Sequence, residues 1–123
     1  MFETLQTSID NTVGIITLNR PKRLNALSLQ LGEDLISAAA WFDQQPAVRV
    51  VIIRGSGRAF CAGADLQGFP QPGNEGLRDA ADTGRRMADA VEQMRAVTIA
   101  QLHGWCVGGG LVLAAACDLR VAA

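Results

Sequence analysis

The run RVVIIRG at residues 49–55 constrains the fold more than any other stretch of the chain. Four consecutive β-branched residues, from Val50 to Ile53, are typical of a strand that is buried on both faces of a parallel sheet. Patterns typical of helices lie on either side of it, over residues 28–45 and 75–95. Strands that alternate with helices predict an α/β fold, with right-handed crossovers between parallel strands.

Other segments extend this alternation. Residues 2–9 and 14–19 predict a hairpin, because Asp10, Asn11 and Gly14 supply turn residues between two strands. Further strands are expected over residues 98–104 and 119–123, with a helix opened by the glycines at 108–110.

Helical spacing of apolar residues gives each long helix a core-facing stripe. Ser28 is the predicted N-cap of the first helix. The first stripe consists of Leu31, Leu35, Ala39 and Phe42, and the second of Leu77, Ala80, Gly84, Met87, Val91 and Met94.

Composition narrows the class of protein. With 123 residues, 49% of them hydrophobic, the chain has the size and apolar content of one domain over residues 1–123. A formal net charge of −1 argues against nucleic acid as a partner. The N-terminus lacks the apolar region of a signal peptide, and no apolar run is long enough to span a membrane. Three cysteines without a CxxC motif predict reduced thiols in a cytoplasmic protein and neither a metal site nor a bound redox cofactor.

Two glycine-bearing turns share one design, in which a strand exits into a turn and a helix follows. They are IIRGSGRAFCAGADL at residues 52–66 and AQLHGWCVGGGLVL at 100–113. Glycine lets another group approach the backbone closely, and a helix start presents unpaired N–H groups. Two such groups aimed at one point make an oxyanion hole. Close helix–sheet packing is the alternative reading, and a phosphate-binding nest is a third.

Three segments together resemble the crotonase superfamily, the enoyl-CoA hydratase/isomerase family. They are NRPKRLNAL at residues 19–27, AFCAGADL at 59–66 and HGWCVGGGLVLAAACDLRVAA at 103–123. The resemblance covers essentially the whole chain and implies a spiral of β-β-α turns, of which this chain matches the N-terminal half. It also implies an acyl-CoA thioester substrate, a role in fatty-acid metabolism, and a trimer or hexamer.

Matching the family residue by residue assigns the oxyanion-hole N–H groups to Ala64 and Gly109. Lys22 and Arg23 fall beside the expected CoA phosphates, although a solvated basic turn is an equal reading. The full set of substrate-binding positions that the resemblance implies is Lys22, Arg23, Leu24, Ala26, Ala62, Ala64, Asp65, Leu66, Gln67, Trp105, Gly109 and Val112.

The chain departs from the hydratase pattern at Val112, where hydratases of this family carry a glutamate. The second glutamate of that pattern would lie beyond Ala123. Isomerases of the family also lack the first glutamate, so Val112 alone does not exclude catalysis. Two hypotheses follow: a hydratase or isomerase acting through enolate stabilisation, and a truncated, non-catalytic member that binds CoA esters or assembles with another chain. Half a spiral would expose a sheet edge, which predicts a homo-oligomer or a complementary C-terminal half as partner.

A third hypothesis is a thiol hydrolase that pairs His103 with Cys61 or Cys106. The alternative reading makes both thiols core fillers and gives His103 a hydrogen bond to the backbone. Acids that could replace a missing general base are Asp65, Glu75 and Asp79, although Asp65 also suits a helix cap. Asp118 is expected to pair with an arginine, and Trp105 to pack or to line the acyl pocket.

Overall fold

The β-branched run becomes the central strand of a five-stranded sheet, β3 (Val50–Gly55), in a computed structural model that describes residues 2–123. The strand order is β1-β2-β3-β4-β5. β1 (Leu5–Asp10) pairs antiparallel with β2 (Val13–Leu18), as the hairpin prediction requires. The remaining neighbours, including β4 (Val97–Leu102) and β5 (Leu119–Ala122), run parallel. The α/β prediction is therefore confirmed.

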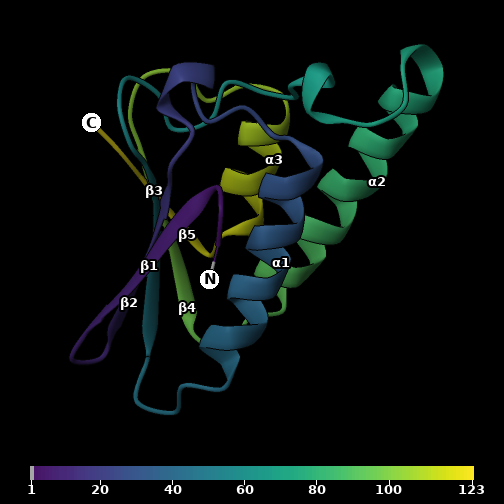
Figure 1. The fold of residues 1–123 in the computed structure, drawn as a ribbon. Coiled ribbons are helices and arrows are strands. Elements are labelled where there is room, and N and C mark those ends of the chain that lie inside the picture. Colours follow the sequence, from purple (N-terminus) through teal and green to yellow (C-terminus); the bar gives the residue numbers. More distant parts are fainter. Residues whose placement is uncertain (1) are drawn as a thin grey trace.

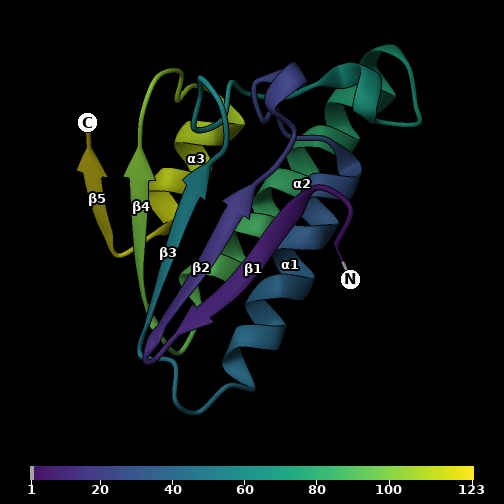
Figure 2. The ribbon, with the colours of Figure 1, turned by 60° about the vertical axis from the view of Figure 1, so that its left-hand side comes forward.

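Three helices connect the parallel strands and lie on one face of the sheet (Figures 1 and 2). They are α1 (Leu29–Asp43), α2 (Gly73–Glu92) and α3 (Gly109–Ala116). Two 3-10 turns, η1 (Pro21–Arg23) and η2 (Leu66–Gly68), lie in the loops above the sheet. Within residues 2–123, no helix is long and apolar enough to cross a membrane.

The core fills the space between the sheet and the three helices. Ser28 caps α1 by accepting a hydrogen bond from the Leu31 N–H at 3.1 Å, as predicted. All four residues of the predicted α1 stripe are buried, and the Phe42 ring lies directly on Gly14. A Cβ on Gly14 would be 2.4 Å from the Phe42 ring. Gly14 therefore serves packing inside β2, and the hairpin turn instead uses Asn11, whose φ is +57°.

The expectation that β3 is buried on both faces was wrong. Val51 and Ile53 face the helices and are fully buried, whereas Val50 and Ile52 are only half-buried. Their face of the sheet has no covering helix in the part of the chain described (Figure 2). The β-branched run thus reflects its central position in the sheet, and only one of its faces is packed against helices.

The second long helix differs from its prediction at both ends. α2 begins at Gly73, two residues before the predicted start, and ends at Glu92. Leu77 is 53% exposed, so it does not belong to the core-facing stripe. Met94 lies beyond the helix but is buried.

Short bridges join the loops that follow the long strands. Leu27 pairs with Ala64, and Cys61 pairs with Cys106, each in a parallel bridge. Each repeat therefore runs from a long strand through a bridge-forming segment to a helix, which is the β-β-α turn that the resemblance implies. The bridges bring three loops together at one end of the sheet. They are the loop after β2, which contains Asn25, and the loops after β3 and β4, which contain the two glycine turns.

Candidate active site

The two glycine turns meet directly above the C-terminal ends of β3 and β4. Gly63 has a φ of +103° and Gly108 a φ of +51°, conformations that side-chain-bearing residues rarely adopt. A Cβ on Gly108 would be 3.4 Å from the Cα of Gly63. A Cβ on Gly109 would be 3.9 Å from the carbonyl carbon of Gly63. The Val107 N–H also donates to Cys61 O at 3.3 Å, so the backbones of the two turns are in direct contact.

Among the backbone N–H groups of the two turns that have no acceptor within residues 2–123 are those of Ala64 and Gly109. In the bridge, the Leu27 N–H donates to Gly63 O at 2.6 Å, and Leu27 O accepts from the Asp65 N–H at 2.7 Å. Leu27 therefore bonds to the residues before and after Ala64, and the Ala64 N–H points to the opposite side of the strand, away from Leu27. Gly109 is the first residue of α3, where N–H groups have no partner within the helix. Neither the Ala64 N–H nor the Gly109 N–H donates to any group within residues 2–123.

The three consecutive glycines have different structural reasons. Gly108 is required by its positive φ. Gly110 is required by packing, because a Cβ there would be 2.2 Å from the carbonyl oxygen of Cys61. Gly109 is the least constrained, since its φ is not positive and the nearest atoms to a Cβ there would be Leu27 Cδ2 at 3.2 Å and Leu27 Cβ at 3.4 Å. Backbone conformation accounts for Gly108 and packing for Gly110, whereas neither requires a glycine at position 109 as strongly.

Both free N–H groups belong to residues that line one cavity of about 400 Å³. Its remaining lining residues are Leu27, Val112 and four residues of α2: Ala80, Ala81, Gly84 and Arg85. Two backbone donors beside an apolar cavity can hold a carbonyl oxygen that gains negative charge while the attached chain stays out of water. Val112, the position at which the resemblance implies a glutamate in hydratases, also lines this cavity but can neither give nor take a proton.

Asp65 fixes the turn that carries Ala64. Its carboxylate caps η2 by accepting a hydrogen bond from the Gln67 N–H at 3.2 Å, which confirms the predicted cap. It also pairs with Arg20 at 3.1 Å and with Arg23 at 2.9 Å, across more than forty residues of sequence. The hydrogen bond from Arg23, followed by that from Arg20, holds the pKa of Asp65 below its usual range. Asp65 is therefore a structural carboxylate, unsuited to act as the general base.

Asp65→Asn is expected to lower the free energy of unfolding at pH 7 by about 1–2 kcal/mol. The expected loss is smaller than for a fully buried ion pair, because Arg23 is half-exposed and water screens its charge. A depressed folded-state pKa stabilises the fold above the unfolded-state value of about 3.9, and this stabilisation disappears as pH falls through the folded-state pKa. The difference between wild type and variant should therefore shrink below about pH 4. Urea unfolding of both proteins at several pH values measures this difference in unfolding free energy. A constant difference, or an equal loss in the exposed control Asp82→Asn, would contradict the assignment.

Asn25 is a positioning residue that sequence reasoning missed. It is fully buried, with a φ of +54°. Its amide donates to Ser56 O at 2.8 Å and Ala59 O at 2.9 Å, while its side-chain oxygen accepts from the Arg20 N–H at 2.7 Å. These bonds tie the loop after β2 to the loop after β3. An asparagine in a turn is the only local signal for this role.

Most of the other substrate-binding positions implied by the resemblance lie on η1, on η2 or in the segments that join the loops. Lys22 and Arg23 lie on η1 and are exposed, and the Arg23 guanidinium is already bound to Asp65 and Gln67. Ala26 and Ala62 lie within the segments that join the loops. Their hydrogen bonds include one from Arg20 to Ala26 O and one from the Ala62 N–H to Leu24 O. Leu66 and Gln67 are exposed on η2.

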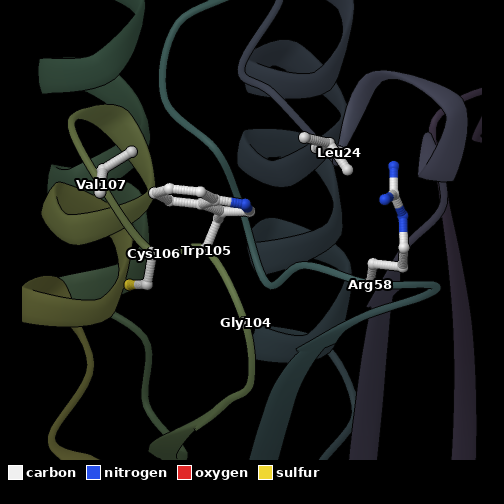
Figure 3. Close-up of a pocket in the computed structure, with 6 residues that line it drawn as sticks. All are labelled: Leu24, Arg58, Gly104, Trp105, Cys106 and Val107. Carbon is white, nitrogen blue, oxygen red and sulfur yellow. The ribbon is translucent and has the colours of Figure 1, made fainter.

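Trp105 lines a different cavity from the one beside Gly109. Its indole is 61% exposed and lies across an open hollow of about 590 Å³ from Leu24 and Arg58 (Figure 3). The structure therefore gives Trp105 neither a core position nor a place against the two free N–H groups.

The remaining candidate acids and the histidine have structural surroundings. Asp118 accepts from the Thr98 N–H at 2.9 Å, so its partner is a threonine and the backbone of β4 instead of the expected arginine. Glu75 is exposed in the first turn of α2. His103 Nε2 lies 2.8 Å from Gly57 O, the backbone hydrogen bond that its position predicted.

The thiols are poorly suited to nucleophilic attack. Cys61 is buried, and burial raises the pKa of its thiol, as it does for Cys106 and for Cys117, whose pKa reaches about 11. Thiolate is the reactive form, so each shift lowers reactivity. His103 Nε2 is hydrogen-bonded to Gly57 O. Within residues 2–123, no hydrogen bond joins the His103 ring to a thiol.

Iodoacetamide at pH 7.5 is expected to label native Cys61 and Cys117 far more slowly than the half-exposed Cys106, because burial hinders both access and ionisation. Mass spectrometry of labelled peptides over time measures the three rates. In denaturant, all three should react quickly. Rapid native labelling of Cys61 would restore the thiol-hydrolase hypothesis.

The fold and the two free N–H groups define an α/β protein with backbone donors beside one apolar cavity, and comparison with known proteins identifies its family. Residues 8–123 match the enoyl-CoA hydratase/isomerase family, and the chain belongs to that family. It is 36% identical to the peroxisomal Delta(3,5)-Delta(2,4)-dienoyl-CoA isomerase of Arabidopsis thaliana, covering 96% of this chain and 47% of that protein. It is 40% identical to a protein of Mycobacterium bovis described as a probable enoyl-CoA hydratase, covering 99% and 47% respectively.

Solved structures agree with this assignment. The enoyl-CoA hydratase of Bacillus anthracis superposes with a TM-score of 0.91 at 36% identity, covering 98% of this chain and 47% of that one. The predicted crotonase-like fold is thus confirmed over residues 2–123. The chain spans about half the length of the relatives it matches.

Proposed function

We propose that the chain binds an acyl-CoA thioester and stabilises its enolate with the backbone N–H groups of Ala64 and Gly109. The observation that carries the proposal is that two unpaired donors, from turns 45 residues apart, flank the same apolar cavity. The thioester oxygen would accept both hydrogen bonds, and the acyl chain would enter the cavity along α2. These bonds strengthen as the oxygen gains charge, so they favour the enolate over the ground state.

Proton transfer is the part of the reaction that the described residues do not supply at the cavity. Hydration adds hydroxide to C3 and a proton to C2 of the enoyl group, and isomerisation moves a proton between carbons. Either reaction needs a group that gives and takes protons. None of the cavity-lining residues within 2–123 is a carboxylic acid or a histidine. Binding and polarising the thioester is therefore the function assigned to these residues, and a proton-transfer group elsewhere would complete a hydratase or isomerase.

Two substrates separate the catalytic and binding hypotheses. Crotonyl-CoA reports turnover through loss of its enoyl-thioester absorbance. Acetoacetyl-CoA ionises to an enolate with its own ultraviolet absorbance, so a functional oxyanion hole should increase that absorbance without any protein base. Turnover supports an enzyme, and an enolate signal without turnover supports a binding member. Absence of both, at protein concentrations well above micromolar, would refute the proposed function.

Apolar residues exposed on α3 and β5 support self-association or assembly with a complementary chain. Leu111 is 58% exposed on α3, and Leu119 and Val121 are 55% and 57% exposed on β5. β5 is an edge strand, so its outer backbone groups have no neighbouring strand within residues 2–123.

Light scattering after size exclusion is expected to give a mass above that of one chain, because an apolar edge strand favours pairing. Val121→Lys should shift the population towards monomer, since lysine on an edge strand disfavours strand pairing. The matched control Gln6→Lys changes β1 at the opposite edge and should have little effect. A stable wild-type monomer would rule out self-association.

A further inference from the structure

Arg85 is the single charged side chain among the described residues that line the cavity beside Ala64 and Gly109. The wall that α2 contributes has small residues at Ala80, Ala81 and Gly84, followed by this arginine. The spacing of these residues places them along one stripe of the helix, over little more than one turn. An apolar cavity with one cation is suited to an apolar chain that carries an anionic group.

The present partner of Arg85 can be exchanged at small cost. The Arg85 guanidinium donates to Asp82 Oδ1 at 2.6 Å, but both side chains are mainly exposed, at 69% and 50%. Exposed ion pairs of this kind contribute little to stability. Asp82 also accepts from Arg86 at 3.2 Å, so its carboxylate would keep a cationic partner if Arg85 turned to a ligand.

The neighbouring arginine differs in its surroundings and does not line the cavity. Arg86 donates to Glu33 Oε1 on α1 at 2.7 Å and to Asp82. It therefore links α1 to α2, while Arg85 lies at the rim of the cavity. Two adjacent arginines thus provide a matched pair of equal charge, one beside the cavity and one outside it.

We propose that Arg85 selects acyl-CoA thioesters whose acyl chain ends in a carboxylate. This inference rests on the proposed function, because it assigns the distal end of the acyl group to the cavity that the oxyanion hole opens into. The guanidinium would donate to the ligand carboxylate in place of Asp82, with two parallel N–H···O bonds available from its planar fork. The alkyl part of the chain would contact Leu27, the small residues of α2 and Val112.

Binding of hexanoyl-CoA and adipoyl-CoA, measured by titration calorimetry, tests the inference. The two esters share a six-carbon acyl chain and differ in the terminal carboxylate. Wild-type protein is expected to bind adipoyl-CoA roughly three- to tenfold more tightly, as for a single solvent-accessible charged hydrogen-bonded pair. The ratio of the two dissociation constants should fall to about one in Arg85→Met, which keeps the apolar stem but loses the charge.

Two further variants make the result specific. Arg86→Met removes the same charge one residue away and should preserve the ratio. Asp82→Asn removes the competing carboxylate and should increase the ratio, provided that Arg85 is the receptor. Raised salt should lower the wild-type ratio, because exposed charges are screened.

The outcomes distinguish the inference from the function on which it rests. Binding of hexanoyl-CoA with a wild-type ratio near one, or a ratio that Arg85→Met leaves unchanged, overturns the role of Arg85 and leaves the proposed function intact. A ratio lost equally in Arg85→Met and Arg86→Met shows a general charge effect and also overturns it. Failure to bind either ester refutes the proposed function and, with it, the inference.

Discussion

If the chain is an enzyme, turnover of crotonyl-CoA is expected to fall about 100- to 1000-fold when Gly109 is replaced by proline. If the chain only binds acyl-CoA esters, the same substitution is expected to abolish the acetoacetyl-CoA enolate signal. Proline lacks a backbone N–H, so the substitution removes one of the two donors beside the cavity. Proline is accepted at the first position of a helix, which is where Gly109 lies. The comparison of far-UV circular dichroism spectra establishes whether α3 and the sheet remain folded.

Gly109→Ala is the matched control because it retains the N–H and adds only a methyl group. That methyl would lie 3.2 Å from Leu27 Cδ2 and 3.4 Å from Leu27 Cβ, so Leu27 must shift by a few tenths of an ångström to accommodate it. The alanine variant should therefore keep most of the wild-type signal. Equal losses in both variants would show that Gly109 is needed for space, and an unaffected proline variant would exclude its N–H from the site. An amide-to-ester replacement at Gly109 removes the donor without a ring and serves if the proline variant does not fold.

Phe42→Ala is expected to lower the free energy of unfolding by about 3–5 kcal/mol. Phe42 is completely buried between α1 and the sheet, and its ring lies on Gly14 of β2. The space left by the missing ring would stay largely empty, because Gly14 on β2 has no side chain that could move into it. Chemical denaturation followed by circular dichroism measures the loss. The neighbouring Trp41 is 41% exposed, so Trp41→Ala should cost clearly less.

A double-mutant cycle tests the specific contact between Phe42 and Gly14. Gly14→Ala alone should be strongly destabilising, because its Cβ would be 2.4 Å from the Phe42 ring. In a Phe42→Ala background the same methyl enters a cavity, so its cost should become smaller or change sign. Additive effects of the two substitutions would show that this packing contact does not hold the helix against the sheet.

Local chemistry made much of the fold predictable. A capping serine, apolar residues at helical spacing and a β-branched run each act over a few neighbouring residues, and the α1 and β3 segments formed close to where these signals placed them. Gly14 and Leu77 were misassigned for the opposite reason. The first is a glycine because Phe42 packs on it, and the second is exposed because the interface of α2 turns away from it. Neither fact is a property of the surrounding sequence.

The candidate site was predictable in part. The resemblance located the turns that carry Ala64 and Gly109, and the structure places both residues on one cavity. The wall on α2 and the buried Asn25 were missed, because small residues on a helix and an asparagine in a loop have many ordinary explanations. The Asp65–Arg20–Arg23 cluster was also missed, since its members are separated by more than forty residues.

The sequence by itself determined the alternation of strands and helices, the positions of the sharp turns and the family, because these depend on short-range sterics and on motifs in a fixed order. The tertiary structure decided which face of the sheet is covered, which N–H groups remain unpaired and which of two adjacent arginines lies beside the cavity. These properties arise only when distant segments pack, because burial and hydrogen-bond pairing are set by neighbours in space.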